Sequence, residues 1–354
     1  MKIMMVITGM QSGGAERVMA TLCNELSARH KVRLVIMKDS KSDYELSDKV
    51  EVVSGNILNK DLLKCIKFTS SQMDLFKPDA VLAFMTKSNI IALFAKICAK
   101  AKAPVVIAER ANPFYAQRIF KIIRKFLYPC ANGFVFQTKQ AQEYYKPMLK
   151  NMSNTILKNP LNPDFKVEPY KGERKQKIVS VGRLSVEKNQ RLLITAFSKI
   201  ADKYPDYIVE FYGDGPLKDE LDACIRELKL ENRVFLMGRK DNIQKHTADA
   251  EIFVLPSNSE GMPNALLEGM ALGLACVSTD CPIGGPAMII NNNENGILVP
   301  MNDADKMAEA IERLITDKAL AESMGEKAKN IVNEYDAKVV CGQWEEYLVS
   351  VAEN

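Results

Sequence analysis

Residues 252–268 read IFVLPSNSEGMPNALLE, and this stretch indicates the fold most clearly. A short apolar run stops at Pro256, a polar loop follows, and helical periodicity starts near Asn264. An apolar run without polar alternation is typical of a strand that is buried on both faces, as in a parallel sheet covered by helices. The stretch therefore predicts a strand, a loop and a helix, with Glu260 in the loop and Glu268 about one turn into the helix.

The same alternation of apolar runs and amphipathic stretches recurs along all 354 residues. Each half of the chain holds one complete series of alternating strands and helices. The sequence therefore predicts an α/β protein with two doubly wound domains. The Pro-rich, charged segment 159–177 separates them, with the domains placed at 1–165 and 166–339. The predicted strands are Ile3–Ile7, Val32–Met37, Val50–Val53, Ala80–Phe84, Val105–Ala108, Phe134–Gln137, Ile178–Val181, Ile208–Tyr212, Val234–Met237, Ile252–Leu255, Ala275–Ser278 and Ile297–Val299.

Composition limits the class of protein. Apolar residues make up 47% and charged residues 26%, as in soluble globular proteins. No apolar run approaches the roughly 20 residues of a membrane-spanning helix, and the short apolar start Met1–Ile7 is interpreted as a buried strand rather than a signal peptide. Eight scattered cysteines and two histidines favour reduced thiols in a cytoplasmic protein over a disulfide framework or a zinc site.

Charge is divided unevenly between the halves. Residues 1–165 hold 25 Lys and Arg against 13 Asp and Glu, whereas residues 166–354 hold 23 against 31. The basic half suits an anionic partner, and membrane phospholipid, a lipid-linked pyrophosphate and nucleic acid all qualify on charge alone. The acidic second half and the lack of interleaved aromatic and basic residues argue against a nucleic-acid-binding module.

The segment Phe114–Tyr128 has no acidic residue and the pattern of a basic amphipathic helix. One interpretation is an ordinary helix whose apolar face enters the core and whose basic side chains are solvated. Together with the positive charge of the same half, the pattern favours peripheral contact with an anionic membrane surface. The basic residues are Arg118, Lys121, Arg124 and Lys125, and the apolar residues are Ile119, Ile122, Ile123, Phe126 and Leu127.

Residues that follow the predicted strands are the candidates for ligand contact, because doubly wound sheets bind ligands at the carboxyl ends of their strands. The first strand is followed by TGMQSGGAER at 8–17, in which Gly13 and Gly14 precede a helix. Such glycines either let backbone N–H groups approach a phosphate or form a plain tight turn. The spacing matches neither the dinucleotide-binding fingerprint nor the phosphate-binding loop of nucleoside triphosphatases. The missing dinucleotide fingerprint argues against a dehydrogenase.

The first strand of the second half is followed by GRLSVEKN at 182–189. It places Gly182, Arg183 and Lys188 at the strand exit, where two cations suit a leaving diphosphate. Two solvated basic residues in a loop are the alternative interpretation. The loop Gly213-Asp214-Gly215-Pro216 after the next strand either approaches a ligand or is a turn without one.

The stretch 252–268 holds the strongest candidate site. The carboxylates of Glu260 and Glu268 can accept hydrogen bonds from hexose and ribose hydroxyls. Between them lie Gly261, Met262, Pro263 and Asn264, where backbone N–H groups and a helix N-terminus can face a phosphate. A capped surface helix with two exposed glutamates is equally compatible with the spacing.

Four motifs stand in a fixed order along the chain: GGAER at 13–17, Gly182-Arg183 with Lys188, the Glu260–Glu268 pair, and NGILVP at 295–300. In this order they resemble the motifs of family 4 glycosyltransferases, and the resemblance covers essentially the whole chain. It implies the GT-B fold, with two Rossmann-like domains, a cleft between them, and a last helix (residues 340–354) that packs back onto the N-terminal domain. It also implies an N-terminal acceptor domain, a C-terminal nucleotide-sugar domain, and a retaining, metal-independent transfer that forms an α-linkage without a cofactor.

The resemblance assigns roles by position. It implies that Arg183 and Lys188 bind the donor diphosphate, that Glu260 contacts the hexose, and that Glu268 contacts the ribose. Gly13 and Gly14 would pack against the donor phosphate or the acceptor. The acceptor hydroxyl would lose its proton to the leaving phosphate, because retention without a protein nucleophile implies attack on the face from which the phosphate departs.

One loop departs from the family pattern. Many members have a His after the strand that corresponds to Val105–Ala108, whereas this chain reads ERANP at 109–113. That variant is similar to members that extend lipid-linked glycans with hexosyl or N-acetylhexosaminyl units. Glu109, Arg110 and Asn112 are therefore candidates for orienting the sugar or the acceptor.

The predicted function is a hexosyl- or N-acetylhexosaminyltransferase of polysaccharide or capsule biosynthesis. We expect a nucleotide-sugar donor, with uridine diphosphate the commoner choice and guanosine diphosphate open, and a lipid-linked or nascent polysaccharide acceptor. We expect the protein in the cytoplasm at the inner face of the membrane. The alternative is another sugar-nucleotide enzyme of the same fold, such as an epimerase or a sugar phosphorylase.

Overall fold

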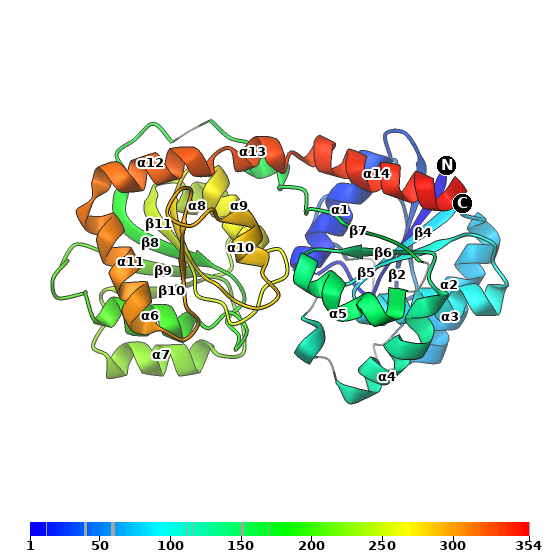
Figure 1. The fold of residues 1–354 in the computed structure, drawn as a ribbon, viewed down its shortest axis with the longest axis horizontal. Helices are drawn as coiled ribbons and strands as arrows, with labels where there is room; N and C mark the ends of the chain where they lie inside the picture. The colour runs from blue at the N-terminus through cyan, green and yellow to red at the C-terminus, as the bar shows by residue number, and fades with distance from the viewer. Residues whose placement is uncertain are drawn as a thin grey trace. The chain divides into compact units, whose positions relative to one another are not determined.

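The computed structural model describes residues 1–11, 13–38, 41–57, 61–110, 112–115, 117–149, 152–168 and 170–353. They form two compact units, drawn in Figure 1: unit 1 is Met1–Asn162 with Tyr335–Asn354, and unit 2 is Pro163–Glu334. Strands and helices alternate in both units, which confirms the α/β class. The divisions fall at 162/163 and 334/335 instead of 165/166 and 339/340. Tyr335 belongs to unit 1 because it is buried there and its carbonyl accepts the Leu161 N–H at 2.8 Å.

Unit 1 is built on a seven-stranded sheet in the order β3-β2-β1-β4-β5-β6-β7, and every neighbouring pair is parallel. Strand β4 is buried along its length and β1 is buried except at its first residue, because apolar side chains on both faces meet helices. The strands are β1 (Lys2–Ile7), β2 (Lys31–Ile36), β3 (Glu51–Ser54), β4 (Ala80–Phe84), β5 (Val105–Ala108), β6 (Gly133–Phe136) and β7 (Ser153–Ile156). The helices are α1 (Gly14–Leu26), α2 (Leu62–Phe76), α3 (Thr86–Ala99), α4 (Arg118–Leu127), α5 (Lys139–Leu149) and α14 (Ala337–Glu353), with 3-10 turns η1 (Pro113–Tyr115) and η2 (Tyr128–Cys130).

Unit 2 repeats this plan with a six-stranded parallel sheet in the order β10-β9-β8-β11-β12-β13. The strands are β8 (Lys175–Val181), β9 (Ile208–Tyr212), β10 (Val234–Gly238), β11 (Ala250–Leu255), β12 (Ala275–Thr279) and β13 (Ile297–Val299). A 3-10 turn, η3 (Pro163–Phe165), opens the unit. The helices are α6 (Gln190–Ser198), α7 (Lys218–Glu227), α8 (Ile243–Thr247), α9 (Asn264–Ala271), α10 (Gly285–Ile289), α11 (Ala304–Thr316), α12 (Lys318–Ala328) and α13 (Ile331–Glu334).

Each predicted strand is present, and one further strand, β7, was missed. It reads Ser-Asn-Thr-Ile, lies at the edge of the sheet, and is exposed or half-buried, so it lacks the continuous apolar run of a buried strand. A side chain from far along the chain holds it in place. The Tyr347 hydroxyl donates to the Ser153 carbonyl at 2.8 Å and accepts from the Phe134 N–H at 3.2 Å.

The last helix, α14, is part of the core of unit 1. It runs beside α1 (Figure 1), and Trp344 on its inner face is 1% exposed. The Trp344 ring lies 5.4 Å from that of Phe84, centroid to centroid, and its Nε1–H donates to the Lys158 carbonyl at 3.0 Å. A buried aromatic side chain with its polar atom satisfied is a strong anchor. Among the described residues, every helix is too short or too polar to cross a lipid bilayer.

The strand order locates the place to look for ligand contacts. In both sheets the order reverses beside the first strand of the unit, between β1 and β4 in unit 1 and between β8 and β11 in unit 2. Helices that follow the two strands of such a pair lie on opposite faces of the sheet, which leaves a crevice at the carboxyl ends. The loops after these four strands are therefore the candidates.

Candidate functional site

In unit 2, the loop after β8 and the loop after β11 are tied together. The Asn258 N–H donates to the Glu187 carbonyl at 2.8 Å, and its side-chain amide donates to the Val186 carbonyl at 2.8 Å. The Asn189 amide reaches the Asn258 side-chain oxygen at 3.0 Å. These contacts join the two loops at the carboxyl edge of the sheet and fix the groups that they carry.

The two loops bring together Lys188 and Glu260. The Lys188 Nζ lies 2.6 Å from Glu260 Oε1, and the Ser257 hydroxyl donates to the same oxygen at 2.6 Å. Glu260 is 8% exposed, whereas the Lys188 side chain is 27% exposed. The Glu260 N–H donates to the Pro282 carbonyl at 3.2 Å, which holds the loop against the segment after β12. The carboxylate is thus fixed, and the lysine remains within reach of a ligand.

Sequence reasoning missed Ser257. It is fully buried between Glu260 and β12, and its own carbonyl accepts the Thr279 hydroxyl at 2.5 Å. A serine in a polar loop has no periodicity that would distinguish it. Its position just after a buried strand and three residues before Glu260 is the one signal that could have identified it.

Arg183 lies on the same loop as Lys188, with its side chain exposed and its carbonyl held by the Gln190 side-chain amide at 2.9 Å. The pKa of Glu187 on this loop lies below its usual value. Hydrogen bonds from its own backbone N–H and from the Ser185 hydroxyl are the main causes, and Arg183 and Lys188 contribute. The loop therefore presents two cations, which is the charge that a diphosphate requires.

The glycines of the Gly213–Pro216 loop are explained by a close approach within the protein. Gly213 has φ +144°, and a Cβ there would lie 2.0 Å from the Gly182 carbonyl oxygen. A Cβ on Gly215 would lie 2.2 Å from the Leu184 carbonyl oxygen. Of the two interpretations from sequence, the turn without a ligand is sufficient, because both glycines serve the packing of this loop against the loop that carries Arg183.

Helix α9 begins just after Glu260 and without a side-chain cap. Its N-cap is Pro263, whose side chain accepts no hydrogen bond, and the Pro263 carbonyl accepts the Leu266 and Leu267 N–H groups at 3.1 and 3.2 Å. Met262 is 5% exposed, and Gly261 lies so close to α10 that a Cβ on Gly285 would be 1.3 Å from its carbonyl oxygen. The sequence did not single out Gly285, although a glycine pair just before a helix was a usable signal.

The Glu268 side chain is buried in unit 2. It is 5% exposed and lines a cavity of about 10 Å³ with Phe165, Ile243 and Phe253. That volume suits about one water molecule. The interpretation of two exposed surface glutamates is wrong for both carboxylates, because Glu260 is also mostly buried.

In unit 1, the N-terminus of α1 already has a carboxylate beside it. The Tyr44 hydroxyl donates to the Gly13 carbonyl at 2.8 Å and lies 2.9 Å from the Gly13 nitrogen. A Cβ on Gly13 would lie 2.1 Å from Glu16 Oε2, so the glycine makes room for the Glu16 side chain. Burial raises the pKa of Glu16 above its ordinary value. Gly14 is exposed at the start of the helix.

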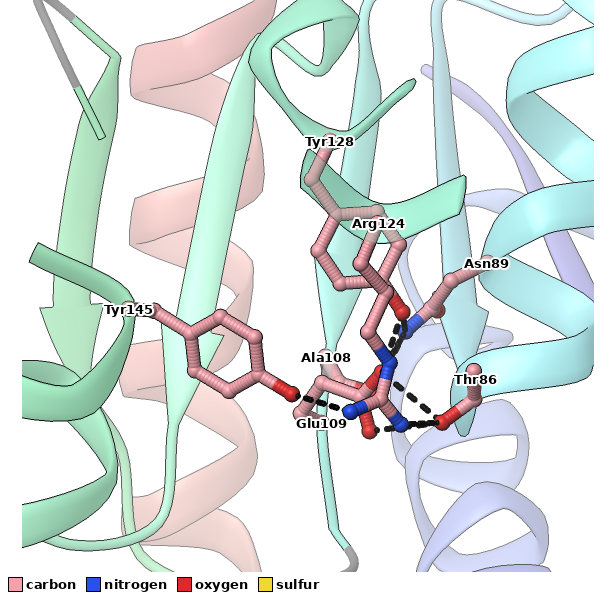
Figure 2. A network of polar contacts seen from close by, with 7 residues as sticks. All are labelled: Thr86, Asn89, Ala108, Glu109, Arg124, Tyr128 and Tyr145. Carbon is pink, nitrogen blue, oxygen red and sulfur yellow. Dashed lines mark hydrogen bonds and ion pairs between the residues drawn. The ribbon is translucent and has the colours of Figure 1, made fainter. Parts of the chain in front are cut away.

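The three candidates after β5 do not share one surface. Glu109 is 3% exposed and points into unit 1, where Thr86, Asn89, Arg124 and Tyr128 surround its carboxylate (Figure 2). A direct contact with sugar does not fit this burial. A role of Glu109 in orienting the sugar or the acceptor stays a prediction, and it would act through neighbouring side chains.

Arg110 and Asn112 lie differently. The Arg110 guanidinium lies over the Phe84 ring, 4.7 Å from its centroid, and donates to the Asn159 side-chain oxygen at 2.5 Å. The Asn112 side-chain oxygen accepts the Phe114 N–H at 2.9 Å, which shapes the turn into η1. Both residues remain candidates for contact with the acceptor.

The amphipathic segment Phe114–Tyr128 is a shorter helix than predicted, since α4 begins at Arg118. Its faces differ from those of the ordinary helix that was the alternative interpretation. Arg124 is 3% exposed instead of solvated, whereas Ile119, Ile122 and Phe126 are 56%, 56% and 73% exposed. Leu127 is buried and Ile123 is half-buried. The ordinary arrangement, with this apolar face in the core, is therefore wrong for three of the five apolar residues.

Comparison with known proteins gives a consistent result. Residues 162–331 match the family model described as glycosyl transferases group 1. A Campylobacter jejuni protein is 30% identical over 371 residues, covering 98% of this chain and 99% of its own. It is named N-acetylgalactosamine-N,N'-diacetylbacillosaminyl-diphospho-undecaprenol 4-alpha-N-acetylgalactosaminyltransferase. A second C. jejuni protein, 25% identical over 362 residues and 99% of each chain, is named an alpha-1,4-N-acetyl-D-galactosaminyltransferase of a PP-undecaprenol-linked glycan.

Solved structures share the fold across the whole chain. Sucrose-phosphate synthase from Thermosynechococcus elongatus has a TM-score of 0.85 at 16% identity, covering 99% of this chain and 98% of that one. Anabaena HepE, solved in complex with UDP, has a TM-score of 0.81 at 18% identity, covering 99% and 100%. At these identities the likeness concerns the fold, and it agrees with the GT-B architecture that the sequence motifs imply.

Proposed function

Because the chain belongs to the group 1 glycosyltransferases, we propose that it transfers a hexosyl or N-acetylhexosaminyl unit from a UDP-sugar to a lipid-linked glycan, forming an α-linkage. One observation carries the proposal for the donor side: Lys188 and Glu260 are paired at 2.6 Å at the carboxyl edge of the sheet in unit 2. They lie beside the exposed Arg183 and before a helix without a side-chain cap. The two C. jejuni relatives support the acceptor class through their names.

The proposed roles follow from burial and charge. Glu260 is fixed by Ser257 and Pro282 and would accept hydrogen bonds from hexose hydroxyls. Lys188 and Arg183 would bind the diphosphate, with the N–H groups of the first turn of α9 adding a further anion contact. Glu268 would contact the ribose, after a small movement of the side chains around its cavity. Unit 2 is thus proposed as the donor unit and unit 1 as the acceptor unit.

Without donor, Lys188 is the countercharge of the mostly buried Glu260 carboxylate. When the diphosphate binds, it would compete for the same ammonium group. The Ser257 hydroxyl would then remain as the fixed donor to Glu260. Because Lys188 would serve both partners, binding of the diphosphate would weaken the ion pair between Lys188 and Glu260, the residue proposed to contact the sugar.

The proposed reaction is retaining and independent of a metal ion. The acceptor hydroxyl oxygen attacks the anomeric carbon on the face from which the diphosphate leaves. The bond between the anomeric carbon and the phosphate oxygen breaks as the new glycosidic bond forms, and the hydroxyl proton passes to the departing phosphate. Arg183 and Lys188 stabilise the charge that develops on that phosphate, and the loss of one such donor costs roughly 10²–10³-fold in turnover.

The acceptor is proposed to be anchored in a membrane, and unit 1 has a surface suited to that location. Ile119, Ile122 and Phe126 are exposed on α4, and Arg118 and Lys125 are exposed on the same helix. Exposed apolar and basic side chains on one helix suit the interface of an anionic bilayer. We therefore place the protein in the cytoplasm, on the inner membrane surface.

A transfer assay tests the proposal. The full chain is incubated with UDP-sugars or GDP-sugars and with a glycan linked through diphosphate to a polyprenol, and the product is identified by mass spectrometry. The expected result is an acceptor lengthened by one or more sugar units with a UDP-sugar. An isomerised donor in the absence of acceptor would favour an epimerase, and product formed only from a GDP-sugar would contradict the proposed nucleotide.

A further inference from the structure

Helix α4 carries its charged and apolar side chains in an unusual arrangement. Ile119, Ile122 and Phe126 follow one another at spacings of three and four residues, so they form a row along one side of the helix, and each is more than half exposed. Arg124 is on the opposite side and is 3% exposed. Burial of the apolar row with Arg124 in solvent would be the usual arrangement for such a sequence. The structure has the reverse.

Arg124 is held by side chains from other elements of unit 1 (Figure 2). Its Nε lies 3.5 Å from Glu109 Oε1, its Nη1 donates to the Tyr145 hydroxyl at 2.8 Å, and its Nη2 donates to the Thr86 hydroxyl. Tyr145 is on α5 and Thr86 is the first residue of α3. The guanidinium is a planar fork, so these partners define its direction as well as its depth.

Glu109 is held in place by contacts other than the one with Arg124. It follows directly after β5, a strand inside the sheet, and its oxygens accept the Thr86 hydroxyl at 3.0 and 3.1 Å and the Tyr128 hydroxyl. The Asn89 amide lies 3.5 Å from one of the oxygens and donates to the Ala108 carbonyl at 3.2 Å. Burial raises the pKa of this carboxyl, and the Arg124 charge opposes that change. The carboxylate that forms the ion pair with Arg124 is therefore fixed at the carboxyl end of a strand inside the sheet.

Stability alone does not explain this pair. A buried ion pair gives up the hydration of both charges, and apolar side chains of similar volume commonly stabilise a protein as well or better. Helix α4 has three large apolar side chains that could occupy the interior instead. Apolar packing selects one rotation of a helix about its axis only weakly. A directional ion pair can select one rotation strongly.

We infer that the Glu109–Arg124 pair sets the rotation of α4 so that Ile119, Ile122 and Phe126 face an anionic lipid bilayer. The inference rests on the membrane contact proposed above, and it makes Glu109 and Arg124 positioning residues for that contact. Charge supports a bilayer as the partner, because residues 114–128 contain no acidic side chain. Phe114 extends the apolar surface, since it is 56% exposed and packs edge-on against Tyr144 with ring centroids 4.8 Å apart.

Flotation of the full chain with vesicles tests both ideas separately. Vesicles of phosphatidylcholine alone are compared with vesicles that also contain phosphatidylglycerol. The surface variant is Ile119→Ser/Ile122→Ser/Phe126→Ser, and the pair variant is Glu109→Met/Arg124→Met. The control is Thr69→Val, a change at a fully buried polar residue on α2 of the same unit. Unfolding of unit 1 is followed by the fluorescence of Trp344, the one tryptophan of the chain.

The expected result is that the wild-type chain and Thr69→Val bind the anionic vesicles at least about tenfold more tightly than the neutral ones. The surface variant loses this binding. The pair variant keeps a cooperative melt and loses the binding as well, because α4 is free to turn its apolar row inward. Loss in the surface variant with wild-type binding in the pair variant would overturn the inference and leave the membrane contact in place. Wild-type binding in the surface variant would instead refute the contact itself.

A second variant decides the question if the pair variant does not melt cooperatively. Glu109→Gln removes the charge and keeps the shape of the side chain. Hydrogen exchange of the α4 amides, without vesicles, is expected to become about tenfold faster, while the amides of α5 keep their protection. Unchanged exchange in α4 would show that the pair does not fix this helix.

Discussion

The Lys188 ammonium group lies 2.6 Å from a Glu260 oxygen that also accepts the Ser257 hydroxyl, so one carboxylate oxygen is shared by a movable cation and a fixed hydroxyl. The cation comes from the loop after β8 and the hydroxyl from the loop after β11. This arrangement gives the two partners separable roles. Lys188 is expected to act on the chemistry, and Ser257 on the position of the Glu260 carboxylate.

Glu260→Ala and Lys188→Ala are each expected to abolish transfer while the fold remains, with a fall in turnover of roughly 10²–10³-fold or more. Lys188→Ala should also destabilise unit 2 by about 1–3 kcal/mol, because it leaves the mostly buried Glu260 without its countercharge. Transfer rates and circular dichroism melts measure the two effects. Lys203→Ala is the matched control. It breaks the ion pair between the exposed Lys203 and Glu312, and it should leave transfer unchanged. Normal transfer by either site variant would refute the assignment of the donor site.

Ser257→Ala is expected to weaken donor use without removing any charge. The Ser257 hydroxyl is buried against Glu260, so its loss should cost about 1 kcal/mol of stability and let the carboxylate move. A misplaced sugar contact lowers kcat/KM by up to about 100-fold. Steady-state kinetics with varied donor concentration checks this. Ser198→Ala, at the end of α6, is the control, and equal kinetics in the two variants would show that Ser257 does not position Glu260.

Gly285→Ala is expected to be severe, because the added Cβ would lie 1.3 Å from the Gly261 carbonyl oxygen and must displace the loop that carries Glu260. We expect a loss of about 2 kcal/mol or more in the stability of unit 2 and no measurable binding of UDP. Gly342→Ala is the contrasting change, since a Cβ at this position in α14 would meet no atom of the described residues within 4 Å apart from its own stretch of helix. It should stabilise the helix by about 0.5–1 kcal/mol. Isothermal titration with UDP and thermal melts compare the two, and wild-type UDP affinity in Gly285→Ala would contradict the structure of this loop.

Acid should weaken the attachment of α14. The hydrogen bond from Arg29 holds the pKa of Glu345 below its usual value, with burial opposing and His30 assisting. A carboxyl with a depressed pKa in the folded state contributes stability above its unfolded pKa of about 4.3, and this contribution is lost as the pH falls through the folded value. Urea unfolding followed by Trp344 fluorescence should show Glu345→Gln less stable than the wild type at pH 7, and this difference should shrink as the pH falls below about 4.3. The difference should be small and sensitive to salt, because Arg29 is 55% exposed. A difference of constant size from pH 7 down through the acid range would exclude ionisation of Glu345 as its cause.

The sequence predicted the sheets well because buried parallel strands leave continuous apolar runs, whereas β7 escaped because an edge strand of polar residues leaves none. The meeting of Lys188 and Glu260 was also predictable in outline. Their loops follow the first and fourth strands of a doubly wound unit, which lie side by side. The sequence could not show that Arg124 turns inward. Amphipathic periodicity shows that a helix has two faces, and the choice between them depends here on Glu109, which follows a strand earlier in the chain.

Unit 2 is inserted between residues 162 and 335 of unit 1, and Trp344 completes the interior of unit 1 beside Phe84. The consequence concerns the order of events during synthesis. Until α14 has left the ribosome, the Lys158 carbonyl and the edge strand β7 lack the partners that this helix supplies. Unit 2 has its whole sequence available earlier, although it is translated second. The nascent chain can therefore complete its C-terminal unit before its N-terminal one, which reverses the order in which domains generally fold during translation.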